Sequence, residues 1–212
     1  MNYTQTRDNM VESQLRTNKI VDARLIAAFA SVEREQFLPL ELQPIAYVDE
    51  EISLSNGRFL LEPMVFARLV QAAAIKQTDR VLVVGAGCGY GAAIVARLTT
   101  DVVALESDET LLHNPEKLAG ITVAIGALDE GCAAHAPYDV IVIEGSVADV
   151  PPVISAQLAD GGRLVTIVRE DAYTTGQAVL LLKQANALSQ TRLFDASTPY
   201  LTGFASKPSF VF

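Results

Sequence analysis

The 212-residue chain has little positive charge, few cysteines and few histidines. Its 16 basic side chains stand against 25 acidic ones, and the net charge of −9 argues against a groove for nucleic-acid phosphates and against an anionic membrane surface. Two cysteines, Cys88 and Cys132, build no disulfide framework and offer no paired metal-ligand spacing. We therefore expect partners other than nucleic acid, membranes or metal ions.

The sequence also lacks a secretory signal and a long apolar run. Its first residues, MNYTQTRDNMVESQL, contain neither a basic n-region nor an apolar h-region. The longest uncharged stretch lies between Arg80 and Arg97. Its 16 residues include four glycines, so it is too short and too broken for a membrane-spanning helix. We expect the protein to be cytoplasmic.

Apolar residues make up 50% of the chain, and a chain of this length builds a sizeable core without disulfides. We expect a single domain over residues 1–212. The residue pattern divides the chain into a helical and loop-rich region (1–78), a central region (79–175) and a C-terminal region of edge strands (176–212).

The first region reads as helices followed by a loop. Apolar residues recur at roughly helical intervals between Met10 and Val32, and Asp22 is placed to cap the second helical segment. A loop-like stretch from Phe37 to Glu62 follows, and Pro63 is well placed as the first residue of another helix.

From residue 80 onward, short apolar runs alternate with helical patterns. The runs are rich in Val and Ile without strict alternation, which is typical of strands buried on both faces of a parallel sheet. We predict strands at RVLVV, VVAL, GITVAI, DVIVI and RLVTIV, helices at YGAAIVARL and DETLLHNPEKL, and antiparallel edge strands at VLLLK, TRLFDA and the final SFVF. The fold class is therefore α/β, with a doubly wound and mostly parallel sheet.

A glycine-rich turn joins the first of these strands to the next helix. Glycines stand at Gly85, Gly87 and Gly89, and a dinucleotide-binding fingerprint would require its third glycine at Tyr90. The observed Gly-x-Gly-x-Gly spacing is the form used by S-adenosylmethionine-dependent methyltransferases, and it disfavours a dehydrogenase. The residues assigned to this cofactor-binding loop are Gly85, Ala86, Gly87 and Gly89.

An acid closes the following strand. Glu106 comes 21 residues after Gly85, where a carboxylate accepts both ribose hydroxyls of an adenosyl group. Each part also has a purely structural reading, since glycines make tight turns and a strand-end acid is often solvated. The combination of strand, glycines, helix, strand and acid favours S-adenosylmethionine binding.

Several blocks resemble the protein-L-isoaspartate O-methyltransferase family. In chain order they are MVESQLRTNKI, VDARLIAAFASVEREQFLP, AYVDEEISL, VLVVGAGCGYGAAIVARL, VAIGALDEG, APYDVIVIEGS, VPP and QLADGGRLV, within residues 10–168. The resemblance implies methyl transfer from S-adenosylmethionine to the free carboxylate of an isomerised aspartyl residue in a damaged protein or peptide. It further implies that the first 60 residues cover the cofactor crevice.

The chain departs from this family at three polar positions. The family's Gly-Gln-Thr-Ile-Ser-Gln-Pro reads GRFLLEP here, so Leu61 replaces the serine that contacts the substrate carboxylate. Val83 stands where the strand before the glycine loop usually supplies an acid, and the adenine-flanking Gly-Asp-Gly has become Gly-Ala127-Leu128. Backbone N–H groups of Ala127 and Leu128 remain candidates for adenine contacts.

Two acids stand where the family is neutral. Glu62 lies in the substrate loop, and Glu144 ends the strand VIVIE, at the sheet edge where open α/β sheets bind ligands. Glu144 either faces the acceptor or pairs with an arginine such as Arg169, and a solvated role is favoured for Glu62. The candidate catalytic positions are Leu61, Glu62 and Glu144.

Methyl transfer to a carboxylate needs no general base, since the acceptor is already ionised at neutral pH. Three hypotheses follow: an active carboxyl methyltransferase of the resembled family, an S-adenosylmethionine-dependent enzyme for a different and even small-molecule acceptor, or a catalytically inactive ligand-binding or interaction module. The sequence leaves the acceptor and the oligomeric state open.

Overall fold

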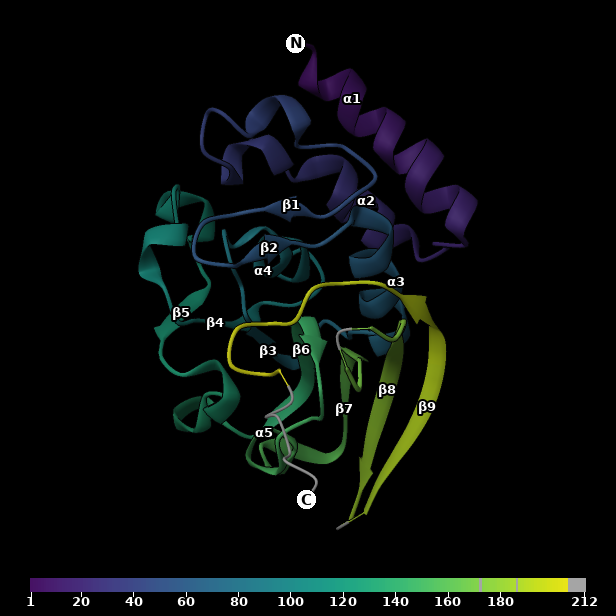
Figure 1. Cartoon of the computed structure of the whole chain (residues 1–212), viewed down its shortest axis with the longest axis vertical. Helices are drawn as coiled ribbons and strands as arrows, with labels where there is room; N and C mark the ends of the chain where they lie inside the picture. The colour runs from purple at the N-terminus through teal and green to yellow at the C-terminus, as the bar shows by residue number, and fades with distance from the viewer. Residues whose placement is uncertain (172, 186, 206–212) are drawn as a thin grey trace.

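The computed structural model describes residues 1–171, 173–185 and 187–205, and it is built around a central sheet (Figure 1). Within these residues the sheet has seven strands in the order β5-β4-β3-β6-β7-β8-β9. The strands from β5 to β7 run parallel, whereas β8 and β9 are antiparallel. The strands are β3 (Arg80–Val84), β4 (Asp101–Glu106), β5 (Thr122–Ile125), β6 (Tyr138–Val147), β7 (Leu158–Val168), β8 (Gly176–Gln184) and β9 (Ala187–Ala196).

The central strands are buried on both faces, which confirms the predicted α/β class. In β3, Val81 and Val83 pack into one apolar cluster together with the helical residues Phe29 and Phe66. Alternate residues of the same strand pack into a second cluster that contains Ile154 from a helix on the other face. The chain therefore winds helices onto both faces, as the uninterrupted Val and Ile runs predicted.

Helices cover the sheet from both sides. Asp22 caps α2 by accepting from the backbone N–H groups of Arg24 and Leu25, and Pro63 opens α3, so both sequence predictions are confirmed. The α-helices are α1 (Tyr3–Met10), α2 (Ala23–Ser31), α3 (Pro63–Ala73), α4 (Tyr90–Val95) and α5 (Pro152–Ala156). One π-helical turn, Val11–Leu15, extends α1, and short 3₁₀ turns occupy Arg16–Asn18, Arg34–Phe37, Gln43–Ile45, Glu109–Leu111, Pro115–Leu118, Leu128–Glu130 and Ala133–His135.

Two segments differ from the sequence prediction. The helix predicted at DETLLHNPEKL is wrong, because this segment forms two separate 3₁₀ turns on either side of Asn114. Pro115 lacks a backbone N–H and disfavours a helical residue before it, which breaks the pattern there. The stretch predicted as loop contains a two-stranded hairpin, β1 (Ile52–Ser53) with β2 (Phe59–Leu60).

The C-terminal prediction is confirmed for VLLLK and TRLFDA, which lie in the antiparallel β8 and β9. The third predicted strand, SFVF, lies outside the described residues. After β9 the chain runs back across the sheet to β6, where a backbone bridge joins Tyr200 to Ser146 (Figure 1).

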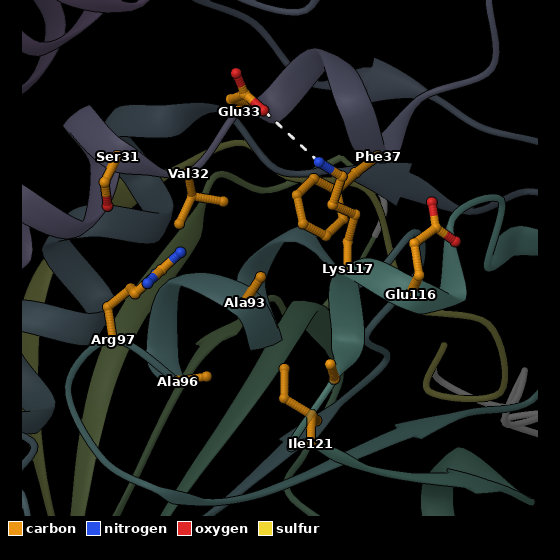
Figure 2. A pocket seen from close by; sticks show the side chains of 11 residues that line it. Ser31, Val32, Glu33, Phe37, Ala93, Ala96, Arg97, Glu116, Lys117 and Ile121 are labelled. Carbon is orange, nitrogen blue, oxygen red and sulfur yellow. Dashed lines mark ion pairs between the residues drawn. The ribbon is translucent and has the colours of Figure 1, made fainter.

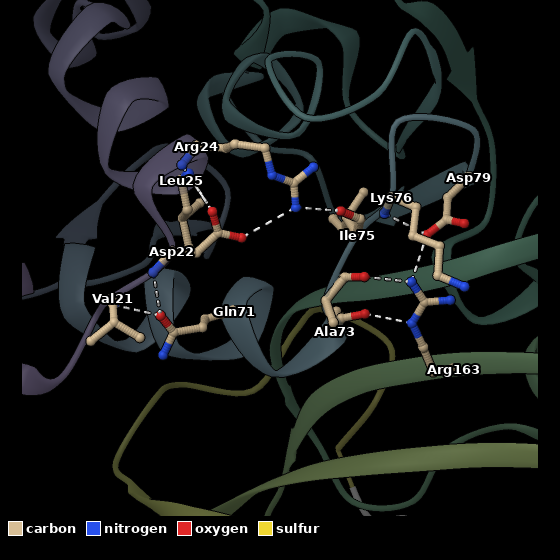
Figure 3. Close-up of polar contacts among 11 residues, drawn as sticks. Val21, Asp22, Arg24, Leu25, Gln71, Ala73, Ile75, Lys76, Asp79 and Arg163 are labelled. Atoms are coloured by element: carbon tan, nitrogen blue, oxygen red, sulfur yellow. Dashed lines mark hydrogen bonds and ion pairs between the residues drawn. The ribbon is translucent and has the colours of Figure 1, made fainter.

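Polar contacts anchor the N-terminal region to the sheet (Figure 3). The Gln71 side chain on α3 accepts hydrogen bonds from the backbone N–H groups of Val21 and Asp22, at 2.7 and 3.1 Å. Arg163 on β7 donates to the carbonyl of Ala73 at the end of α3 and to the carboxylate of Asp79. These contacts fix α3 between the N-terminal helices and the sheet. Across the described residues, no helix is both long and apolar enough to cross a membrane.

Candidate active site

The glycine loop lies between β3 and α4, at the carboxyl ends of the parallel strands. Gly85, Gly87 and Gly89 have φ angles of +77°, +55° and +88°. Residues with a Cβ adopt such positive φ angles only at a cost in conformational free energy. The N–H groups of Gly85 and Ala86 both donate to the carbonyl oxygen of Leu105, at 2.9 and 3.0 Å. The loop is therefore folded tightly against the neighbouring strand β4, where ligands of α/β sheets bind.

Glu106 ends β4 and lies directly beside this loop. Its side chain is fully buried, and its Oε2 accepts a 2.7 Å hydrogen bond from the Gly87 N–H. Its Oε1 accepts from the backbone N–H and the hydroxyl of Ser107 and from the N–H of Asp108. The structure thus brings together the glycines and the acid that the sequence paired.

Arg58 occupies the remaining side of this carboxylate. Its Nη2 lies 2.8 Å from Glu106 Oε2, and the two side chains are 3% and 0% exposed. Arg58 was not among the residues predicted from the sequence, although it stands in the substrate-loop segment at a position where the resembled family has glutamine. Only the path of the β1–β2 hairpin brings it to Glu106.

The loop after β5 approaches the same acid through its backbone. The N–H of Gly126 donates to the Glu106 carbonyl at 3.0 Å. Of the two predicted adenine contacts, Ala127 is exposed, whereas the Leu128 side chain is buried in the core. Leu128 also opens a 3₁₀ turn, and its carbonyl accepts from the N–H of Gly131.

Leu61 and Val83, two of the departures from the family, are core residues. Leu61 is 2% exposed, and its carbonyl accepts a 2.8 Å hydrogen bond from the buried Arg34. Val83 is completely buried in the cluster below α3 and α4. Neither side chain has a polar group for a cofactor or an acceptor, so any polar contact to the acceptor must come from another residue.

Glu144 on β6 is a candidate for that contact. It is buried, its Oε1 has no hydrogen-bond partner, and it lines a small cavity together with Arg58 and Leu61. Burial raises the pKa of its carboxyl to about 8, although the charges of Arg58 and Arg34 act in the opposite direction. The carboxyl is therefore mostly protonated at neutral pH and is able to donate a hydrogen bond.

Glu62 follows Leu61 and directly precedes α3. It is half-buried rather than solvated, and burial together with the nearby Asp49, Glu51 and Glu50 raises its pKa to about 7. Pro63 follows it as the first helical residue, so the side chain is held at the start of α3.

A nucleophilic cysteine is not part of this site. Cys88 lies in the glycine loop, but burial raises the pKa of its thiol to about 11, so it stays protonated at neutral pH. Among the residues that the structure describes, no group of three or more His, Cys, Asp or Glu side chains is arranged to hold a metal ion.

The glycine loop and the Glu106 carboxylate are of the kind that holds an adenosyl group, but side chains fill the space beside them. A Cβ on Gly85 would lie 2.7 Å from Leu201 Cδ1, and one on Gly89 would lie 2.8 Å from Leu118 Cδ2. The cavity next to Arg58 measures only about 10 Å³, whereas small-molecule sites typically enclose ~300–1,000 Å³. S-adenosylmethionine fits here only after these side chains have moved.

A larger groove lies on another side of α4 (Figure 2). Its volume is about 370 Å³, and two of its lining residues, Glu33 and Lys117, form an ion pair of 3.7 Å. Its lining combines apolar side chains, among them Val32, Phe37 and Ile121, with charged ones such as Arg97 and Glu116. The cofactor residues assigned above do not line it, so it is separate from the glycine loop.

The sheet order and the glycine loop followed by a strand-end acid define the fold of the S-adenosylmethionine-dependent methyltransferases. The chain belongs to the protein-L-isoaspartate O-methyltransferase family: the model of the protein-L-isoaspartate(D-aspartate) O-methyltransferases matches residues 5–201. Enzymes of this family use S-adenosylmethionine. The predicted family, enzyme class and cofactor are thereby confirmed.

Curated relatives agree with this assignment. A protein-L-isoaspartate O-methyltransferase of Koribacter versatilis is 36% identical over 204 residues, which cover 93% of this chain and 90% of the relative. One from Opitutus terrae is 36% identical over 168 residues, covering 76% of this chain and 72% of the relative.

Solved structures share the fold. A protein-L-isoaspartate O-methyltransferase superposes with a TM-score of 0.80 at 23% identity, covering 94% of this chain and 67% of that one. A Plasmodium falciparum protein described by the same name, in complex with S-adenosyl-L-homocysteine, gives a TM-score of 0.76 at 20% identity. It covers 95% of this chain and 99% of that one.

Proposed function

We propose that this protein transfers the methyl group of S-adenosylmethionine to a carboxylate, that of an isoaspartyl residue in a damaged protein or peptide. The observation that carries the proposal is the buried Glu106, held 2.7 Å from the Gly87 N–H at the end of β4. The cofactor supplies an electrophilic methyl group, and the residues 1–212 act together as one methyltransferase domain. An ionised acceptor needs no general base, which agrees with a site that offers no activated nucleophile.

In this proposal Glu144 takes over the task of the missing serine. Leu61 offers no hydroxyl, whereas the protonated Glu144 carboxyl has an unpartnered Oε1 next to the same cavity. A neutral carboxyl donates a hydrogen bond to an acceptor carboxylate, and an ionised one would repel it. Glu62, at the start of α3, orients the peptide around the acceptor.

The cofactor contacts are proposed as follows. Glu106 accepts from the ribose hydroxyls, and the backbone of the loop approaches the methionine end because its glycines carry no side chains. Ala127 and Leu128 flank the adenine through their backbone, with Ala127 the more accessible of the two.

The proposal is tested with S-adenosylhomocysteine and an isoaspartyl peptide. Calorimetry should show saturable binding, and Glu106→Ala should weaken it by about 1–3 kcal/mol, since charge-assisted hydrogen bonds to the ribose are lost. Exposed Glu109 lies three residues further on, so Glu109→Ala is the matched control and should bind as the wild type does. Thermal melting establishes that both variants are folded.

Methyl release from the isoaspartyl peptide, compared with the same peptide containing normal aspartate, identifies the acceptor. If the protein binds S-adenosylhomocysteine but methylates neither peptide, the result favours a different acceptor. One observation favours the alternative of an inactive interaction module: the cavity beside Arg58 is too small for a cofactor. Absence of any S-adenosylhomocysteine binding at millimolar concentration would support that alternative and reject the enzyme.

A further inference from the structure

The β1–β2 hairpin carries Arg58 into the space beside the glycine loop. Its Nη2 lies 2.8 Å from Glu106 Oε2 and 3.0 Å from the position that a Cβ would take on Gly85. A second contact joins the hairpin tip to the end of β4, where the side-chain amide of Asn56 donates to the carboxylate of Asp108. The hairpin is therefore fixed over the carboxyl end of β4 at two points.

With Arg58 in place, Glu106 has no acceptor capacity left for a ribose. An ionised carboxylate offers about four lone-pair sites. About two of these sites belong to each oxygen. Three donors from Ser107 and Asp108 already crowd Oε1, and Arg58 and the Gly87 N–H fill the sites of Oε2, so the departure of Arg58 frees one site on Oε2. Four of these donors are local to β4 and the loop, and only Arg58 comes from a distant segment.

A second element covers the loop from the other end of the chain. The segment after β9 is hydrogen-bonded to β6, with the Leu201 N–H donating to the Ser146 carbonyl at 2.8 Å. This places the Leu201 side chain directly over Gly85, where only the absence of a Cβ makes room for it. The glycine that would admit a ligand instead admits a leucine of the same chain.

The closed arrangement leaves buried polar atoms unpaired. Arg58 Nε and Glu144 Oε1 both lack a hydrogen-bond partner, although both side chains are almost completely buried. Each unpaired buried group costs free energy that is regained when water or a ligand reaches it. The contacts that close the crevice are thus opposed by groups that gain from its opening.

We propose that Arg58 and Leu201 form a plug that occupies the cofactor crevice of the ligand-free protein, and that S-adenosylmethionine binds only after the hairpin Ile52–Leu60 has lifted Arg58 off Glu106. The inference rests on the proposed function, because it takes Glu106 to be the ribose acceptor. The cofactor then competes with a side chain of the chain itself, and its apparent affinity is reduced by the fraction of molecules that are open.

The test compares Arg58→Gln with Arg80→Gln in the full chain. Arg80 on β3 forms an ion pair of the same 2.8 Å length with Asp101, which lies on β4 like Glu106 but at the amino end of the strand. Arg58→Gln should bind S-adenosylhomocysteine about tenfold more tightly, the change expected when one charge-assisted hydrogen bond is lost from the closed state. Leu201→Ala should also tighten binding, and Arg80→Gln should leave it unchanged.

Hydrogen–deuterium exchange of the ligand-free proteins gives a reading that does not depend on the cofactor. Arg58→Gln should speed exchange in residues 52–60 and 198–204 relative to the wild type and Arg80→Gln, with thermal melting as the check on folding. Equal exchange in all three proteins overturns the plug, whatever the cofactor does.

The outcomes separate the two proposals. If the wild type binds S-adenosylhomocysteine and Arg58→Gln binds it equally well or more weakly, the plug is overturned. The proposed function is not affected by that result. If no variant binds at millimolar S-adenosylhomocysteine, the proposed function fails, and the exchange rates alone decide whether Arg58 closes the crevice.

Discussion

At the scale of single residues, the site depends on which side chains are absent as much as on those present. Gly91, at the start of α4, illustrates this. A Cβ at this position would lie 1.9 Å from Glu144 Oε1, so the missing side chain is what allows the buried carboxyl to lie against the helix. Burial of Glu144 and the identity of residue 91 are therefore coupled.

This coupling is testable with a double-mutant cycle. Gly91→Ala should lower the free energy of unfolding by about 1–3 kcal/mol, because Glu144 has to move away and the cavity beside it measures only about 10 Å³. In a Glu144→Ala background the clash disappears, and the same change should be neutral or stabilising by up to ~1 kcal/mol, since alanine favours a helix. Urea denaturation of the four proteins measures the coupling, and additive effects would contradict it.

The residue scale also marks the limit of sequence reasoning about the site. The glycines and Glu106 were predictable together, because the carboxyl ends of neighbouring parallel strands meet at one edge of the sheet. Arg58 was not, since it lies 48 residues from Glu106 in the chain and reaches it only through the path of the hairpin. Leu201 was missed for the same reason.

At the scale of elements, the predictions succeeded where burial dictates the pattern. The runs of Val and Ile in β3, β4, β6 and β7 are covered on both faces, and these strands were found as predicted. The predicted β5 also forms, but it lies at the edge of the sheet with Val123 and Ile125 exposed. The segment from Asp108 to Leu118 has helical spacing, but Pro115 interrupts the hydrogen-bond ladder, and 3₁₀ turns form instead. Strands of two residues, as in the β1–β2 hairpin, are too short to leave a periodic signal.

The cap of α2 provides a test at this scale. The Asp22 carboxylate accepts from two backbone N–H groups in the first turn, and its backbone N–H donates to Gln71. Asp22→Ala should lower the free energy of unfolding by about 1 kcal/mol, since two N–H groups lose their acceptor. Asp8→Ala, at an exposed position of α1, is the control and should change stability by less than ~0.5 kcal/mol. If urea denaturation gives the same change in the free energy of unfolding for both variants, the Asp22 cap does not stabilise α2.

At the scale of the whole molecule, the buried acids couple folding to pH. Burial raises the pKa of Glu144 to about 8, and burial with nearby carboxylates raises that of Glu62 to about 7. The unfolded chain loses these protons near pH 4.5, so the folded state binds more protons above that pH. The stability that these protons contribute is complete below about pH 4.5 and is lost as the pH rises through 7 and 8.

Glu144→Gln isolates one of these contributions. The variant should gain stability relative to the wild type as the pH rises from 5 to 8, by up to ~1.4 kcal/mol per pH unit. Urea midpoints at four pH values measure the difference, with Glu109→Gln at an exposed position as the control. A difference that stays constant across this range would show that Glu144 is ionised in the folded protein.

The return of the chain from β9 to β6 has a consequence for the order in which the molecule is built during synthesis. Leu201 and Phe204 belong to the apolar cluster on one face of the sheet, together with residues of β3, β4 and β6 made more than fifty residues earlier. Although α5 covers part of that face, the part under Leu201 and Phe204 stays uncovered until the ribosome has released these side chains. A nascent chain in which β9 has already emerged therefore still has an uncovered glycine loop, and release of the segment after β9 brings Leu201 onto it.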